Sequence, residues 1–304
     1  VARFLAKRYA LNVLAVDLGA ATTSLIAVKK ERVLRAIHPH WGLSLGLDRI
    51  VQHVGLEKIM AWVPGKLPAT EAHARLLNQM LHPATLPTAP EDERALQAAL
   101  RTALMSAATD WHAGPTDLVD GIDLCLISGA PVARGMPYGD LVLMILDALE
   151  LRGIVTLAAD GNGLAAALGA MAAVSPEAAA QLVERDGFIT LGTLIAPFTN
   201  GREGSNALSV HVTTARGGAL DLDVQQGTIE LLPLGLGERA TVEIRPASGV
   251  ELGVPLQGGV LKREMEGGAL GLIIDARGRP LQLPEADEAR REKLQQWLWD
   301  MGGK

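Results

Sequence analysis

The sequence predicts a mixed α/β part over residues 1–186, followed by a β-rich antiparallel part over residues 187–304 that ends in a helix. In the first part, apolar runs of strand length alternate with longer segments whose apolar residues repeat at helical spacing. After residue 186 the pattern changes to short stretches of period-two alternation separated by glycine turns, which favours an antiparallel sandwich or barrel. We therefore expect a domain boundary between residues 186 and 187.

Composition supports this two-part organisation and narrows the classes of partner. The chain has 304 residues, 48% of them hydrophobic, which suffices for two sizeable cores. A formal charge of −6 argues against a nucleic-acid surface. The single cysteine, Cys125, excludes an internal disulfide and fits a reducing cytoplasm. No apolar run approaches the ~18 residues that a bilayer span needs, and the histidines show no metal-ligand spacing, so we expect neither membrane contact nor an intrinsic metal.

The stretch from Val13 to Val28 organises the first part, because it reads as a strand, a tight turn and a second strand. We expect Gly19 to make the turn through a positive φ. The turn presents the carboxylate of Asp17, the hydroxyls of Thr22 and Thr23, and several backbone N–H groups. Such a loop suits a phosphate with its Mg²⁺, the carboxylate facing the metal through water. An ordinary hairpin with a polar tip is the alternative.

This stretch resembles the second phosphate loop of the superfamily of actin, heat-shock chaperones and sugar kinases, and most closely that of the MutL-type protein associated with glutamate mutase. Three later stretches resemble the same family in the same order: Leu43-Ser44-Leu45-Gly46, Leu126-Ile127-Ser128-Gly129-Ala130 and Gly271-Leu272-Ile273-Ile274-Asp275-Ala276-Arg277-Gly278-Arg279-Pro280-Leu281. The resemblance implies an actin-like (ribonuclease-H-like) fold for residues 1–186. It also implies that the chain corresponds to the C-terminal half of a family member, whose other half carries the first phosphate loop.

The same resemblance implies a site for ATP or ADP with Mg²⁺. Asp17 would face the metal through water, and the strand that ends at residue 128 would contact the adenosine. Ala130 and Ser24 depart from the family pattern, which has a glycine and an acid at these positions. The residues expected to bind the nucleotide are Asp17, Gly19, Ala20, Ala21, Thr22, Thr23, Ser128, Gly129 and Ala130.

Further elements follow from local signals. After the hairpin, residues 32–37 predict a third strand, and Ser44 and Thr70 are expected to cap helices over residues 47–63 and 70–81, the first interrupted at Gly55. More helices are expected over 91–110, 138–151, 164–174 and 177–185, with strands over 121–127 and 153–158 between them. Asp160 or Asn162 is expected to cap the helix from residue 164.

In the second part, strands are expected over residues 209–213, 220–224, 228–232, 240–244 and 270–275, and a helix over 285–301. The turn after the last strand carries Asp275, Arg277 and Arg279. These three residues either form a family-specific docking element or build a salt-bridged turn.

Three functions remain open. The first is an actin-like nucleotide-binding accessory protein, a chaperone or reactivating factor, for a cobalamin-dependent mutase. The second is a non-catalytic protein-interaction module with a degenerate nucleotide site. The third is a small-molecule kinase or hydantoinase-like enzyme, but no general base or nucleophile constellation supports it. We expect no catalytic activity from the isolated chain, and ATP hydrolysis only when an upstream half completes the site.

Overall fold

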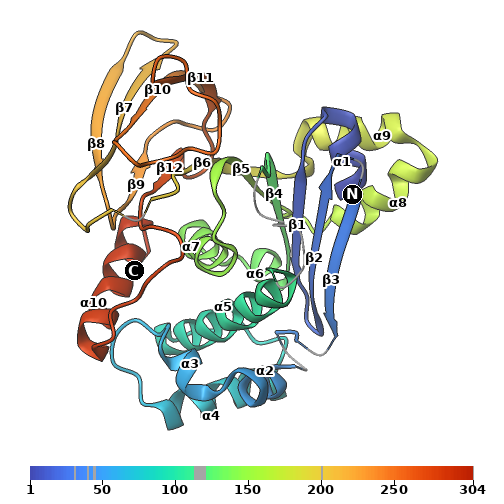
Figure 1. Cartoon of the computed structure of the whole chain (residues 1–304). Helices are drawn as coiled ribbons and strands as arrows, with labels where there is room; N and C mark the ends of the chain where they lie inside the picture. The colour runs from blue at the N-terminus through green and yellow to red at the C-terminus, as the bar shows by residue number, and fades with distance from the viewer. Residues whose placement is uncertain (31, 40, 44–45, 113–120, 200, 304) are drawn as a thin grey trace.

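The computed structural model describes the chain except residues 31, 40, 44–45, 113–120, 200 and 304. An eight-stranded sheet runs through the molecule in the order β3-β2-β1-β4-β5-β6-β12-β9 (Figure 1). Its strands are β1 (Val13–Leu18), β2 (Thr22–Lys29), β3 (Arg32–Pro39), β4 (Leu124–Gly129), β5 (Gly153–Ala159), β6 (Ile189–Ala196), β9 (Ile229–Leu232) and β12 (Leu272–Asp275).

Strand directions divide this sheet into three parts. Strands β1 to β3 form the expected antiparallel meander. Strands β1, β4 and β5 are parallel, which brings their carboxyl ends to one edge of the sheet. Strand β6 runs antiparallel to β5 but parallel to β12, and β9 closes the sheet antiparallel to β12.

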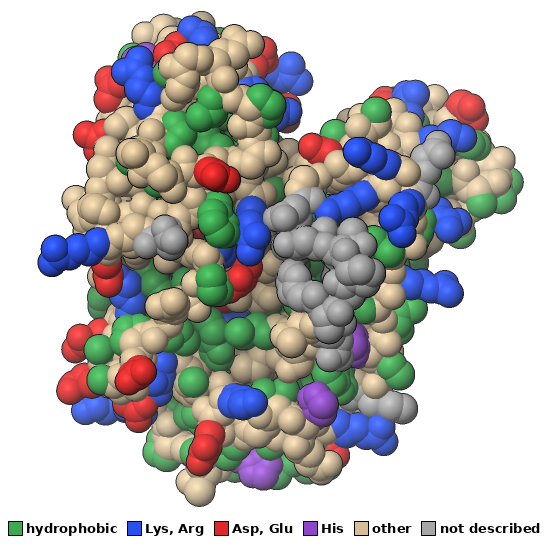
Figure 2. All heavy atoms as spheres, in the orientation of Figure 1, with side chains coloured by type: hydrophobic (Ala, Val, Ile, Leu, Met, Phe, Trp, Pro, Cys, Tyr) green, Lys and Arg blue, Asp and Glu red, His purple; other side chains and the backbone are tan. Residues whose placement is uncertain are grey.

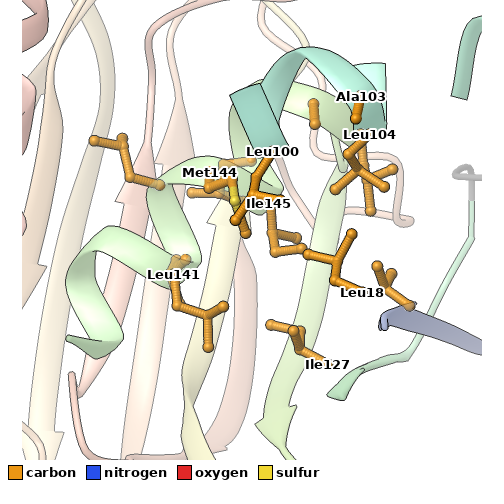
Figure 3. Packing of buried hydrophobic residues seen from close by; sticks show 14 of the residues in the cluster. Leu18, Leu100, Ala103, Leu104, Ile127, Leu141, Met144 and Ile145 are labelled. Carbon is orange, nitrogen blue, oxygen red and sulfur yellow. The ribbon is translucent and has the colours of Figure 1, made fainter. Parts of the chain in front are cut away.

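One face of the large sheet is covered by helices. Helix α5 (Pro90–His112) and helix α7 (Tyr138–Leu149) pack directly on it, and Leu18 and Ile127 of the sheet contact their apolar side chains (Figure 3). α7 is buried along almost its whole length, as its strongly apolar sequence predicts. The helices beyond them on this side are α2 (Leu47–Val54), α3 (Leu56–Met60), α4 (Ala69–Leu81), α6 (Ala130–Ala133) and α10 (Asp287–Asp300).

Two different units share the opposite face. Over the first strands lies a cluster that joins Leu5 of α1 (Ala2–Tyr9) to Leu126 of β4 and Ala158 of β5, with Ala165 of α8 (Ala165–Val174) packed against it. Helix α9 (Pro176–Leu182) and a π-helical turn, Val183–Gly187, follow α8. These helices project at one end of the molecule (Figure 1).

A four-stranded antiparallel sheet covers the other end of this face. Its order is β11-β10-β7-β8, with β7 (Asn206–Thr214), β8 (Ala219–Gln225), β10 (Arg239–Pro246) and β11 (Leu261–Glu266). Val210, Val242 and Ile244 of this sheet share a core with Ile195 of β6 and Ile274 of β12. The small sheet therefore forms a sandwich with the end of the large sheet.

This arrangement changes the expected organisation of residues 187–304. The segments of β9 and β12 were expected as strands of the antiparallel part, and no strand was predicted for the segment of β6, yet all three strands complete the large sheet. A period-two pattern predicts a strand but does not say which sheet the strand joins. The division between residues 186 and 187 thus lies inside the large sheet, between β5 and β6, and the independence of the two parts stays a prediction.

Several helix boundaries follow the sequence signals and others do not. Gly55, with φ of 91°, separates α2 from α3 as expected. Helix α4 begins at Ala69 with Pro68 at its N-cap, so Thr70 lies in the first turn and is not the cap. The expected cap Ser44 lies outside the described residues, and Gly46 occupies the N-cap position of α2.

The surface carries charges of both signs. On the face shown in Figure 2, Lys and Arg side chains gather over the end formed by α1 and the first three strands, and acidic side chains are frequent at the opposite end. Among the described residues, no helix combines the length and apolar character needed to cross a bilayer.

Candidate nucleotide site at the carboxyl edge of the large sheet

Three polar side chains meet where parallel strands end. Asp17 of β1 is the register partner of Ser128 of β4. Asp160 follows β5 directly, and its N–H donates to Ile127 O at 2.8 Å. Register partners in parallel strands point to the same side, so all three side chains lie on the face of the sheet that carries α8. The topology thus collects two carboxylates and a hydroxyl from strands far apart in sequence.

Asp160 is a buried capping residue. Its side chain accepts bonds from Leu164 N (2.7 Å) and Ala165 N (2.9 Å) at the start of α8, and from Ser128 Oγ at 3.1 Å. The residue is only 1% exposed. The expected capping role of Asp160 is confirmed, and these first N–H groups of α8 are consequently engaged within the protein.

Asp17 differs because its side chain is exposed. Partial burial nevertheless raises its pKa, and the nearby charge of Asp160 raises it further. Two carboxylates that face each other in this way favour a cation between or near them. Among the described residues, no group of three or more His, Cys, Asp or Glu side chains is arranged to hold a metal ion. A metal at Asp17 would therefore need water or a phosphate for its remaining ligands.

The turn between β1 and β2 is tighter than its sequence suggests. Gly19 N donates to Thr22 O at 2.9 Å, so this N–H is used within the turn. Gly19 does not adopt the positive φ that we expected; instead, a Cβ at this position would lie 3.0 Å from Thr22 O. Ala20 and Ala21 form the exposed tip. Glycine is favoured at position 19 because a Cβ would be crowded there, and not because the backbone is left-handed.

The two threonines of the turn have different environments. Thr23 is 2% exposed, and its hydroxyl donates to Trp41 O at 2.6 Å. This hydroxyl fixes the segment after β3, and the expected phosphate contact of Thr23 stays a prediction. Thr22 is half-buried and is the first residue of β2, so it lies at the turn, as the sequence predicted.

The end of β4 also requires a glycine. Gly129 has φ of 103°, and a Cβ there would lie 2.4 Å from Leu18 O. The backbones of β1 and β4 therefore approach each other closely at the edge of the sheet. Ala130, which stands where the family pattern has a glycine, is half-buried and begins α6.

A cavity of about 150 Å³ adjoins this edge on the opposite face of the sheet. It is linked to both ends of the site, since Leu43 in its wall donates its N–H to Gly19 O at 3.1 Å and Pro131 follows Ala130. Most of its lining is apolar. The lining residues are Leu43, Leu86, Pro87, Glu93, Leu96, Leu100, Pro131, Arg134, Gly135 and Met136.

The polar groups of this cavity were missed by sequence reasoning. Burial raises the pKa of Glu93, and the nearby charge of Asp140 raises it further. Gln97 Nε2 donates to Asp140 Oδ2 at 2.9 Å and to Glu93 Oε1 at 3.4 Å. Arg134 also lines the cavity, and its guanidinium donates to Pro83 O. The only sequence signal was the acidic first turn of α5, which is equally typical of a helix dipole effect.

A second buried polar cluster lies away from this edge. Asp275 accepts bonds from Arg277 Nε (2.9 Å) and Arg279 Nη2 (2.5 Å), as expected of a salt-bridged turn. Arg277 Nη1 also lies 2.7 Å from Asp147 Oδ1 of α7. Arg101 of α5 completes the cluster, with Nε 2.9 Å from Asp147 Oδ2, although its angle is not that of a hydrogen bond.

The charges of this cluster hold each other ionised. Burial alone raises the pKa of Asp275, but the guanidinium groups of Arg277 and Arg279 more than offset it and keep the pKa well below the ordinary range. Burial likewise lowers the pKa of Arg277, whereas Asp275 and Asp147 raise it, with a net increase. The cluster connects α5 and α7 to the turn after β12.

Cys125 is inert in this structure. It lies in β4, fully buried, and burial raises the pKa of its thiol to about 12. A thiolate nucleophile would need the opposite shift. The expected core role of this cysteine is confirmed.

One of three comparisons with known proteins, that with family models, agrees with the sequence resemblance. One solved structure, component A of the (R)-2-hydroxyglutaryl-CoA dehydratase of Acidaminococcus fermentans, is 12% identical with a TM-score of 0.32, over 59% of this chain and 67% of that chain. The comparison with curated proteins found no match. A family model described as MutL protein matches residues 1–186, more than half of the chain. The chain therefore belongs to the MutL protein family.

Proposed function

We propose that this chain is a nucleotide-binding accessory protein, a chaperone or reactivating factor, for a cobalamin-dependent mutase such as glutamate mutase. ATP or ADP with Mg²⁺ would bind along the carboxyl edge of the large sheet. The observation that carries the proposal is the convergence of Asp17, Ser128 and Asp160 at the ends of β1, β4 and β5, at an edge that a cavity of about 150 Å³ adjoins from the other face of the sheet. Ligands in α/β sheets bind at such carboxyl edges.

The geometry supports a division of the site along the edge. Phosphates would lie over the tip formed by Ala20 and Ala21, near Thr22. Asp17 would face Mg²⁺ through water, because it is the exposed carboxylate of the pair. The base would enter the apolar cavity behind Ala130, where Glu93 and Arg134 offer an acceptor and a donor. The sheet order β3-β2-β1-β4-β5 supports the actin-like assignment.

Calorimetric titration with ATP and with ADP, each with and without Mg²⁺, tests nucleotide binding. A saturable, Mg²⁺-dependent signal in the submillimolar range is the expected result. Titration of a variant with Glu93→Gln then tests the base cavity. The absence of heat and of any nucleotide-induced rise in melting temperature would reject the nucleotide site.

A second candidate function, a docking module, is favoured by the surface of residues 187–304. Large apolar side chains are exposed there, including Leu236 at 67% and Leu220 at 43%. The small sheet would then bind the mutase or an actin-like half that supplies another phosphate loop. Co-purification of a mutase with the wild type but not with the Leu220→Asp, Leu236→Asp double variant, without any nucleotide binding, would favour this function over the first.

A further inference from the structure

A second cavity, of about 270 Å³, lies between the turn after β12, the loop before β7 and helix α10. We propose that it binds a small oxyanion, the carboxylate or phosphate group of a metabolite. It shares no lining residue with the cavity beside Ala130, so it goes beyond the proposed nucleotide site. The proposal rests on Arg279, Lys293, Thr199 and the charges around them.

Arg279 supplies donors that no described residue accepts. It lines the cavity and is only 3% exposed. Its guanidinium donates from Nη2 to Asp275 Oδ2 (2.5 Å) and from Nη1 to Gly278 O (2.8 Å), and its buried Nε has no acceptor among the described residues. Since a guanidinium carries five N–H groups, three of them make no hydrogen bond to a described residue. An oxyanion is the group that satisfies several of them together.

The walls around Arg279 are held in place. Arg277 donates to Asp275 and Asp147 from all three of its side-chain nitrogens, and its guanidinium lies 4.7 Å from the ring centroid of Trp297. Trp297 Nε1 donates to Gly227 O at 3.2 Å. The cavity is therefore lined by a fixed aromatic ring and fixed cations, so a ligand would not have to order them.

Thr199 adds a neutral donor. Its Oγ1 accepts bonds from Gln226 Nε2 (2.5 Å) and Gly201 N (3.3 Å). With both lone pairs used, the hydroxyl proton is left to donate. Thr199 is 2% exposed, so this proton must find its acceptor inside the protein or in the cavity.

The local charge favours an anion. Three cations, Arg277, Arg279 and Lys293, line the cavity, and Glu203 is the one carboxylate in its described lining. Asp275 and Asp147 pair with the two arginines without lining it. Lys293 lies 5.7 Å above the Trp297 ring and pairs with Glu203, whose side chain is 70% exposed. An exposed partner of this kind is displaced at little cost, which would free Lys293 for the ligand.

The indole N–H signal of Trp297 in a ¹H–¹⁵N correlation spectrum tests the proposal, with its assignment from Trp297→Phe. Sodium phosphate and sodium acetate are titrated separately against sodium chloride at constant ionic strength. We expect a saturable shift at millimolar concentration; a response to phosphate assigns a phosphate group, and one to acetate assigns a carboxylate. No shift with either anion, or the same shift with chloride, would overturn the proposal.

Two surface variants sharpen the test without depending on buried Arg279. Lys293→Gln should weaken the anion about 5-fold, and Glu203→Gln should tighten it by up to the same factor, as expected of one partly exposed charge. Lys262→Gln, which breaks an exposed ion pair on the small sheet, is the matched control and should leave the midpoint unchanged. If the anion concentration at half-maximal shift were the same for all three variants, the shift would come from another site, and the proposed site would be rejected.

Discussion

At the scale of single residues, the site depends on the contrast between Asp17 and Asp160. Both are carboxylates at strand ends, but Asp160 is buried and satisfied by N–H groups of α8, whereas Asp17 is exposed. The raised pKa of Asp17 means that the folded protein holds this proton more tightly than the unfolded chain does. Its contribution to stability is therefore present at low pH and is lost as the pH rises through the raised value.

Asp17→Asn should weaken Mg²⁺-nucleotide binding by about 10-fold or more, because it removes the charge that faces the metal. The free energy of unfolding at neutral pH should change by less than about 0.5 kcal/mol, or rise slightly, since repulsion from Asp160 is relieved. Calorimetry and urea unfolding measure the two effects. Asp221→Asn, an exposed acid on β8, is the control and should alter neither; equal affinities for wild type and Asp17→Asn would contradict the role of Asp17.

Gly129→Ala should destabilise the chain by more than about 2 kcal/mol, because it adds a clash with Leu18 O to an unfavourable φ. Gly121→Ala separates the two causes, since Gly121 has φ of 65° but open space around its Cβ position. Urea denaturation of both variants measures the difference. Equal losses of unfolding free energy in the two variants would mean that the clash between a Cβ at position 129 and Leu18 O contributes nothing to the destabilisation.

Single residues also mark the limit of prediction from sequence. Asp17 and Gly129 were recognisable because an acid and a glycine directly follow strand-like apolar runs. The burial of the Thr23 hydroxyl was not, because its acceptor, Trp41 O, comes from a segment 18 residues away. Local sequence identifies a turn, but distant segments decide which of its groups stay available.

At the scale of elements, most strands were predicted, but β6 and β11 were missed, and sheet membership was only partly predictable. Strand β12 is apolar from Leu272 to Ile274 and β6 is apolar from Leu194 to Ala196, and both strands are buried along most of their length. Such runs are typical of strands buried on both faces, unlike the alternating strands of the small sheet. This difference distinguishes β6 and β12 from β7 and β10, and it was available in the sequence.

The cluster of Asp275, Arg277 and Asp147 joins elements from both parts of the chain, so its disruption should be costly. Asp275→Asn should reduce the free energy of unfolding by about 3–5 kcal/mol, since it leaves buried guanidinium groups without their carboxylate. Urea denaturation at neutral pH measures the loss. An unchanged midpoint would show that the cluster is dispensable.

The same carboxylate predicts a pH dependence. The pKa of Asp275 is lowered on folding, so its stabilisation is present above the ordinary carboxyl pKa of ~4 and is lost as the pH falls toward the lowered value. The wild type should therefore lose stability more steeply below pH ~4 than Asp275→Asn does. Acid unfolding followed by circular dichroism compares them, with Asp221→Asn expected to follow the wild type.

At the scale of the whole molecule, the large sheet continues across the boundary that composition and the family match both place near residue 186. Expressed alone, residues 1–186 would leave the edge of β5 without β6 and the buried face of α7 without Arg277. We expect this fragment to aggregate or to remain partly unfolded. Size-exclusion chromatography and circular dichroism test this, and a monomeric, cooperatively unfolding fragment would instead support two independent domains.

The whole chain should show no steady ATP turnover. Phosphoryl transfer needs donors and metal fixed around the transferring group, and here Gly19 N and the Thr23 hydroxyl are engaged within the protein. A coupled assay for ADP release measures turnover. ATP turnover by the wild type that disappears in Asp17→Ala would contradict this prediction and show that the described groups suffice for hydrolysis.

The crossing of the segment Trp41–Leu43 over the β1–β2 turn has a further consequence. A Cβ on Gly42 would lie 2.3 Å from Ala20 O, and Leu43 N and the Thr23 hydroxyl bind the two segments together. The tip is thus clamped before any ligand arrives. Flexible phosphate loops lose conformational entropy when they close on their ligand. This turn has already lost it during folding, so its shape is part of the native state.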